Sequence, residues 1–248
     1  MTKTKQKAPS ANTYEIEVDG RTLYLPRVTH IISEVMSQAK SGMAYWGAQL
    51  ATQYFCTLFD AVTDDDDEDE WWEDFKASPM SPAAQLKEAQ DRGTQAHDLA
   101  ERLFKGEVHV ESRDGVLWVV ESDFEFVPTR YDLAAVRAYQ KFADIDDMRS
   151  EERVYSAEYE FAGTADMIAG SVIGDFKTHK PPVRFSDMVQ ESAYGLAWEE
   201  MTGQHIDTHM VVLLGEDGDF TVGTGYVDPS VFLAVKEVWH ALKEWRLE

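Results

Sequence analysis

A tight turn between two β-like segments constrains this chain more than any other feature of its sequence. Residues 161–169 and 171–178 are rich in strand-forming side chains, and Gly170-Ser171 lies where they meet. Glycine at the first position of a two-residue loop favours a type II′ hairpin turn. This turn would pair the two segments residue by residue and place Asp166 directly opposite Asp175, with Cβ atoms about 5 Å apart.

Two facing carboxylates destabilise a β-ladder unless they share a proton or hold a cation. Lys177 follows Asp175 by two residues, which places it on the same face of the sheet, about 6.6 Å along the strand. Two carboxylates and an ammonium on one face suit a hard divalent ion that bridges carboxylates and a phosphate. The alternative is an Asp at a strand end beside an ordinary Asp–Lys surface pair.

Two predicted helices carry further candidate residues. A long helix that begins at Ser81-Pro82 places His97 and Glu101 on one face, four residues apart. A neutral imidazole there is a candidate metal ligand, and a His–Glu surface pair is the alternative. A later helix places Gln190 and Tyr194 four residues apart, where they either position a nucleic-acid strand or pack on the sheet.

The order of the predicted elements indicates a fold of the α/β or α+β class. The chain begins with a hairpin over residues 14–25 and a helical region over 29–59. After the long helix come a strand over 116–120 and then a helix, three strands, a helix, two strands and a helix. We expect these last elements over residues 129–143, 151–160, 161–169, 171–178, 187–201, 209–214, 220–226 and 228–246.

The expected domain organisation is a disordered leader followed by one domain. The leader covers residues 1–12 and the domain covers 13–248. The parts of the domain are a hairpin and helical part (13–128) with an acidic insertion (60–76), an αβββαβ core (129–226) and a C-terminal helix (227–248).

The chain is strongly acidic, with 23 basic against 46 acidic residues and a net charge of −23. This balance argues against a protein that coats nucleic acid by bulk charge, but it permits a local site where metal ions neutralise carboxylates. Nine acids lie among the eleven residues 64–74. A solvated loop is the favoured interpretation of this run, and a partner-binding or DNA-mimicking segment, helped by Trp71-Trp72, is the alternative.

The cysteine content and the apolar runs exclude several classes of protein. Cys56 is the single cysteine, so the chain alone builds neither a disulfide framework nor a four-cysteine iron–sulfur cluster. No apolar run is long enough to span a bilayer, and no secretory signal follows Met1. We therefore expect no membrane partner and a cytoplasmic location.

Four short motifs, taken in their order along the chain, resemble those of the PD-(D/E)XK nuclease superfamily in its RecB-like exonuclease branch. They are Gly93-x-x-x-His97, Gly163-Thr164-Ala165-Asp166, Asp175-Phe176-Lys177 and Gln190-x-x-x-Tyr194. The segment Pro26-Arg27-Val28-Thr29-His30-Ile31-Ile32 is similar to the N-terminal part of phage members, and the resemblance covers roughly residues 26–226.

The resemblance implies a restriction-endonuclease-like fold, in which an αβββαβ core forms a mixed central sheet flanked by helices. It also implies a site for Mg²⁺ or Mn²⁺, expected as two ions. The implied metal ligands are His97, Asp166, Asp175 and the backbone carbonyl of Phe176, with Glu101 as a further candidate.

Other roles concern catalysis and substrate binding. The resemblance implies that Lys177 is catalytic together with Asp166 and Asp175, and that it positions or activates the attacking water. It implies that Gln190 and Tyr194 contact the substrate. Three positively charged residues are further candidates for contacts with the DNA backbone: Arg92, Lys180 and Arg184. For Lys180 and Arg184, the alternative is a solvated turn.

The expected function is therefore that of a divalent-metal-dependent DNA nuclease. We expect an exonuclease that hydrolyses linear or single-stranded DNA in phage or bacterial recombination or replication, in the cytoplasm of a bacterial host. Its expected partners are DNA and, through the acidic run 64–74, a recombination or replication protein. One alternative is a sequence- or structure-specific endonuclease on the same fold. The other is a non-catalytic acidic interaction protein that retains the fold.

Overall fold

The computed structural model describes residues 11–36, 49–51, 53 and 68–245. The chain divides into two compact units, one formed by Met1–Met36 and Ala96–Glu248 and the other by Ser37–Gln95. The acidic insertion expected at 60–76 falls within the second unit. The expectation of one domain over 13–248 stays a prediction, and residues 1–10 of the expected leader lie outside the described residues.

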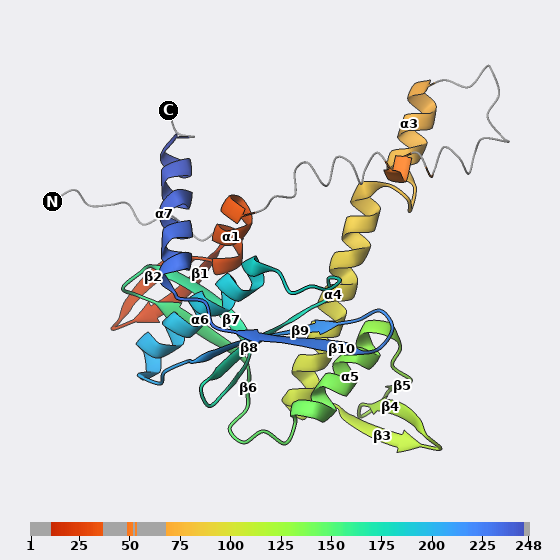
Figure 1. Ribbon diagram of the computed structural model, residues 1–248. Helices are drawn as coiled ribbons and strands as arrows, with labels where there is room; N and C mark the ends of the chain where they lie inside the picture. Colours follow the sequence, from red (N-terminus) through yellow and green to blue (C-terminus); the bar gives the residue numbers. More distant parts are fainter. Residues whose placement is uncertain (1–10, 37–48, 52, 54–67, 246–248) are drawn as a thin grey trace. The chain divides into compact units, whose positions relative to one another are not determined.

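The strands of the described residues form three sheets (Figure 1). A two-stranded sheet contains β1 (Thr13–Val18) and β2 (Arg21–Pro26). A three-stranded sheet contains β3 (His109–Arg113), β4 (Val116–Val120) and β5 (Glu125–Phe126). The five-stranded sheet has the order β10 (Phe220–Gly225), β9 (Thr208–Leu214), β8 (Val172–Lys177), β7 (Phe161–Ala169) and β6 (Arg149–Ser156).

The helices accompany these sheets along the chain. Those named in the described residues are α1 (Val28–Met36), α3 (Glu68–Ala77), α4 (Pro82–Phe104), α5 (Arg130–Phe142), α6 (Phe185–Thr202) and α7 (Ser230–Trp245). None of the helices in the described ranges is long and apolar enough to cross a membrane.

The five-stranded sheet is mixed, because β8 and β9 run parallel while the other neighbouring pairs run antiparallel. A parallel pair needs a long crossover, and α6 provides it between β8 and β9. Helices and several sheets in one chain confirm the expected α/β (α+β) class. The N-terminal hairpin is also confirmed, since β1 and β2 pair antiparallel around Asp19-Gly20.

The turn at Gly170 and Ser171 pairs β7 with β8 as expected, but only over part of their length. The ladder contains Ala169↔Val172, Ile168↔Ile173 and Met167↔Gly174 and then stops. The expected fourth pair, Asp166 with Asp175, is therefore wrong as a ladder pair. Instead, the carboxylate of Asp166 accepts a hydrogen bond from the Phe176 backbone N–H at 2.7 Å. The two strands separate at the position where the acids lie.

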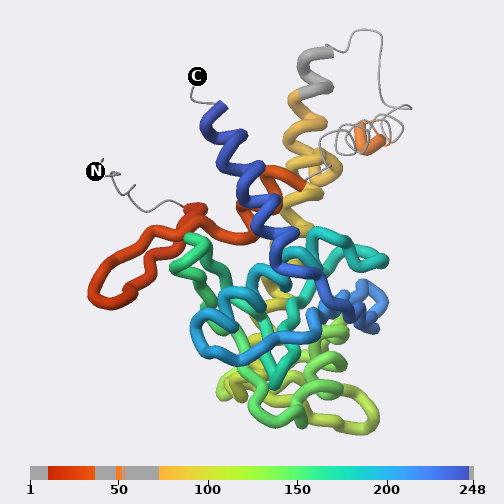
Figure 2. The backbone as a smooth tube through the Cα atoms, turned by 60° about the vertical axis from the view of Figure 1, so that its left-hand side comes forward, coloured from red at the N-terminus to blue at the C-terminus, as the bar shows by residue number. Residues whose placement is uncertain are grey.

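Each face of the five-stranded sheet packs against helices of its own unit. On one face, α6 contributes Val189, Ala193 and Ala197 to a core that also includes residues of α1 and α7. On the other face, alanines of α4 and α5 let the helix backbones come close to the sheet: Ala96, Ala100, Ala134 and Ala138. The β1–β2 hairpin, red in Figure 2, contacts β7 through Ile16, Leu25 and Ala162.

Several expected boundaries differ from the structure. The strand expected over 151–160 ends at Ser156, because a turn follows in which Ser156 Oγ accepts the Tyr159 N–H at 2.9 Å. The acidic run is helical from Glu68 onward, so the expectation of a loop is wrong for that part, while residues 64–67 lie outside the described residues. Most of the helical region expected over 29–59 also lies outside them, apart from α1 and residues 49–51 and 53.

Candidate functional site

The candidate site lies where β7 and β8 separate, and it is almost closed to solvent. Asp166 is 8% exposed and Asp175 is 3% exposed. The Lys177 ammonium forms an ion pair with Asp175 Oδ2. The structure therefore brings together the two aspartates and the lysine that the sequence predicted.

His97 reaches the same place from α4. Its Nδ1 lies 3.3 Å from Asp166 Oδ2, and its ring hydrogen-bonds the Phe176 backbone. The fully buried Ala96 and Ala100 on either side bring this part of α4 against the sheet. Burial lowers the pKa of His97, which keeps the ring neutral at neutral pH. The predicted ligands His97, Asp166 and the Phe176 backbone thus lie next to one another.

Helix α6 covers the site from the other side. Gln190 Nε2 donates a hydrogen bond to Asp175 Oδ1 at 2.9 Å, and Lys177 Nζ lies 3.5 Å from Gln190 Oε1. The Gln190 amide therefore contacts both Asp175 and Lys177 and orients these two charged groups. A Cβ built on Gly163 would lie 2.1 Å from Tyr194 Cε1, so only glycine leaves room for this ring. Tyr194 is 3% exposed, which leaves no free ring face for a base to stack on.

Glu191 is a site residue that the sequence analysis missed. Its side chain is fully buried, and Oε2 has no hydrogen-bond partner among the described residues. Its Oε1 lies 3.5 Å from Gln190 Nε2, and its charge interacts with those of Asp175 and Lys177. The available signal was an acid directly after Gln190, close to the largely apolar helix segment 193–198.

Glu151 is a second missed residue. It lies between two ladder pairs, Ser150↔Met167 and Glu152↔Ala165, and therefore opposite Asp166, with which its side chain interacts by a hydrogen bond. Its φ of 54° is in the left-handed region, which costs backbone energy for a non-glycine residue. Burial raises the pKa of Glu151. No sequence signal marks this position, because the distortion depends on the partner strand.

Burial and like charges dominate the electrostatics of the site. Burial raises the pKa of Asp166 well above its usual value, and the charge of Asp175 adds to the effect. Burial and the charge of Asp175 act on Glu191 in the same direction. For Lys177, burial alone would lower the pKa, but the carboxylates of Asp175 and Asp166 outweigh burial and raise it. The lysine is thus charged at neutral pH while two of the acids tend to hold protons.

The other predicted residues have partners of their own or are exposed. Glu101 forms an ion pair with Lys105, and its charge contributes to the raised pKa of Glu151, so its expected place as a further ligand stays a prediction. Arg92 belongs to the second unit and forms an ion pair with Glu88. Lys180 is exposed in the segment after β8, and Arg184 is exposed just before α6, where its N–H donates to Asp187 Oδ2 at 2.9 Å.

The donor types of the site suit a hard divalent cation. The buried Glu191 Oε2 has no hydrogen-bond partner among the described residues, which is costly, and Mg²⁺ and Mn²⁺ prefer carboxylate oxygens as ligands. Within the described ranges, however, no three His, Cys, Asp or Glu side chains gather into a metal-binding group. The Asp175 carboxylate forms an ion pair with Lys177, and the Asp166 carboxylate accepts a hydrogen bond from the Phe176 N–H. The expected ligand set therefore stays a prediction.

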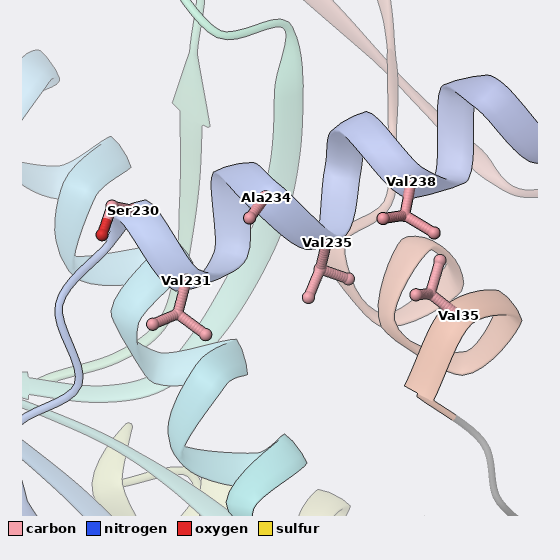
Figure 3. Close-up of a pocket in the computed structure, with 6 residues that line it drawn as sticks. All are labelled: Val35, Ser230, Val231, Ala234, Val235 and Val238. Atoms are coloured by element: carbon pink, nitrogen blue, oxygen red, sulfur yellow. The ribbon is translucent and has the colours of Figure 1, made fainter.

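Two cavities of the first unit lie apart from this cluster. One, of about 460 Å³, lies between α1 and α7 and has apolar walls apart from Ser230 (Figure 3). Another, of about 290 Å³, is lined by residues that include His179, Lys180 and three acids of the β9–β10 loop. Of the predicted site residues, Lys180 alone lines either cavity.

Comparison with known proteins adds little to this description. No protein-family model matches the sequence, and no curated protein matches it. A solved structure described as "Crystal structure of SSO0001" is similar over 79% of this chain and 85% of that chain, at 12% identity and a TM-score of 0.32. A likeness at this TM-score carries no argument about fold or function.

Proposed function

We propose that this chain is a divalent-metal-dependent DNA nuclease of the RecB-like PD-(D/E)XK type, and that it acts as an exonuclease. The observation that carries the proposal is the convergence of Asp166, Asp175 and Lys177, with His97 and Gln190, at the separation of two strands. The order from α5 to β9 is helix, three strands, helix and strand, which is the order that the resemblance implied for the core.

The residues that would hold Mg²⁺ or Mn²⁺ are Asp166, Asp175, His97 and the Phe176 carbonyl, with Glu191 as an added candidate. The bound ion would supply Lewis-acid charge to the scissile phosphate. Lys177 keeps a full positive charge beside Asp175, and this charge would stabilise the negative charge that develops during hydrolysis. Gln190 would fix the direction of both Asp175 and Lys177 through its amide.

The test compares nuclease activity on linear, nicked and covalently closed circular DNA. We expect wild-type protein to hydrolyse linear DNA with Mg²⁺ or Mn²⁺ and to lose this activity in excess chelator. Asp166→Asn and Asp175→Asn should be inactive, because an amide is a poorer ligand for a hard dication. Asp144→Asn makes the same chemical change at an exposed position and should behave like wild type.

Two outcomes would change the conclusion. Full hydrolysis in excess chelator, or by Asp175→Asn, would overturn the metal-dependent nuclease. Cleavage of covalently closed circles would replace the exonuclease with an endonuclease on the same site, because an exonuclease needs a strand end.

A further inference from the structure

Two arginines share one aromatic ring on the first unit. The Cζ atom of Arg27 lies 4.8 Å from the centroid of the Tyr14 ring, and that of Arg153 lies 5.5 Å from it. The Tyr14 hydroxyl and Thr164 Oγ1 are hydrogen-bonded at 3.0 Å. Residues from β1, β6, β7 and the β2–α1 junction therefore place two guanidinium groups around one aromatic ring.

The backbone around this pair is well fixed. The Arg27 N–H donates to the Asn12 carbonyl at 3.0 Å, and Arg27 forms an isolated bridge with Ala162 of β7. Arg153 lies opposite Thr164 in the β6–β7 ladder. Tyr14 packs against the buried cluster of Ile16, Leu25 and Ala162. The two charges are thus carried by paired strands and not by a free loop.

Most arginines of the described residues form ion pairs with carboxylates, but these two do not. Six other arginines in the described ranges form ion pairs with carboxylates: Arg92, Arg102, Arg113, Arg130, Arg137 and Arg149. Arg27 and Arg153 form none with a described carboxylate, although the chain has a net charge of −23. Both are exposed. Two neighbouring cations repel each other, so the arrangement favours an anion supplied from outside.

The pair lies close to the candidate site along β7. Thr164 precedes Asp166 by two residues, which corresponds to about 7 Å along a strand. Tyr194 also connects the two places, because its phenol interacts electrostatically with Asp175 and with Tyr14. An anion bound by the arginine pair would therefore lie near the acids and Lys177.

We propose that Arg27 and Arg153, aligned on Tyr14, bind a phosphodiester group of a nucleic-acid strand next to the bond that the site hydrolyses. This inference rests on the proposed function. Guanidinium groups match the geometry of a phosphate through paired hydrogen bonds, and they remain charged at all relevant pH values. The pair gives a strongly acidic protein a local way to hold a polyanion.

The test is the salt dependence of binding to a labelled single-stranded oligonucleotide, measured by fluorescence anisotropy in excess chelator so that no metal-dependent cleavage occurs. Each lost phosphate contact lowers the slope of log affinity against log salt by about 0.7 for a single strand. We expect this decrease for Arg27→Ala and for Arg153→Ala, with weaker binding at every salt concentration. Arg113→Ala removes an arginine that stacks on Trp118 elsewhere, and it should keep the wild-type slope.

Charge-conserving variants separate contact from folding. Arg27→Lys and Arg153→Lys should retain the wild-type slope, because each keeps one positive charge. Equal slopes for wild type and both alanine variants, or no binding by wild type, would overturn the inference. Sodium phosphate at constant ionic strength provides a further arm. If phosphate displaces the oligonucleotide no more than chloride does, the ligand of the arginine pair is a nucleic-acid strand. If phosphate displaces the oligonucleotide selectively from the wild-type protein, the site binds free phosphate and the proposal of a strand is overturned.

The two proposals fail in different ways. Reduced slopes in a protein that never cleaves DNA with Mg²⁺ or Mn²⁺ would support the phosphate contact and overturn the nuclease. Cleavage that requires Asp175, together with unchanged slopes, would support the nuclease and overturn the phosphate contact.

Discussion

Replacing Gly163 by alanine tests whether the tyrosine on α6 fixes the start of the strand segment that carries Asp166. The added Cβ would lie 2.1 Å from Cε1, 2.8 Å from Cζ and 3.0 Å from Cδ1 of Tyr194. Carbon atoms in contact are normally about 3.5–4.0 Å apart, so the shortest distance is too small by about 1.4 Å. Tyr194 is only 3% exposed, and its ring is not the flexible end of a side chain.

We expect Gly163→Ala to lower the free energy of unfolding by about 3 kcal/mol, at the upper end of the range for overpacked cores. In a protein of this size, that loss corresponds to a decrease in Tm of about 6–12 °C. Chemical denaturation and calorimetry measure both quantities. Gly225→Ala is the matched control, because its Cβ would meet nothing within 4 Å, and it should be neutral or stabilising by up to about 1 kcal/mol.

A double variant identifies the ring as the cause. Tyr194→Ala alone should cost about 3–5 kcal/mol through the cavity it leaves. Gly163→Ala combined with Tyr194→Ala should cost less than the sum of the two by about 2 kcal/mol or more, because the clash is gone. Strict additivity, or a Gly163→Ala variant as stable as Gly225→Ala, would refute this steric argument.

Two further predictions concern the charges of the site. Lys177→Ala should keep its thermal stabilisation by Mg²⁺ but cleave DNA about 10²–10³-fold more slowly, because a group that stabilises transition-state charge is removed. Lys141→Ala, at an exposed position, is the control. Cleavage by Lys177→Ala at the wild-type rate would contradict the catalytic role. The pKa values of Asp166 and Glu191 are raised from 3.8 and 4.5 by burial, so the stability that these protonated groups contribute is full below those values and is lost as pH rises through the raised pKa values. Glu191→Gln should therefore show a smaller decrease in metal-free Tm than wild type as pH rises above 4.5, and an equal decrease would count against a buried, proton-binding Glu191.

Local sequence signals predicted the elements that carry the site. The Gly170-Ser171 turn predicted the β7–β8 register next to the turn, and the four-residue spacing of His97 and Glu101 on the predicted long helix marked His97 as a candidate ligand. These features depend on residues close together in the chain, which explains why they were predictable. The motif resemblance marked Gln190 as a substrate contact, whereas in the structure its side chain donates a hydrogen bond to Asp175 and is only 6% exposed.

Other features depend on residues far apart in the sequence. The Asp166 carboxylate takes the amide of Phe176 instead of facing Asp175, because the two strands separate there. The left-handed Glu151 and the burial of Glu191 arise only when β6 and α6 come against β7 and β8. The edge strand β3 was missed because its polar sequence, from His109 to Arg113, lacks the alternation of a half-buried strand.

The interior position of β8 affects how the site is lost. β8 lies between β7 and β9, and its residues from Val172 to Lys177 pair with β9 in an unbroken parallel ladder. An edge strand can open while the rest of a sheet survives, but a central strand separates only when the sheet itself comes apart. Asp175 and Lys177 therefore share the cooperativity of the whole first unit. Heating should leave the first unit either fully competent or fully unfolded, without a locally melted, half-active form of the site.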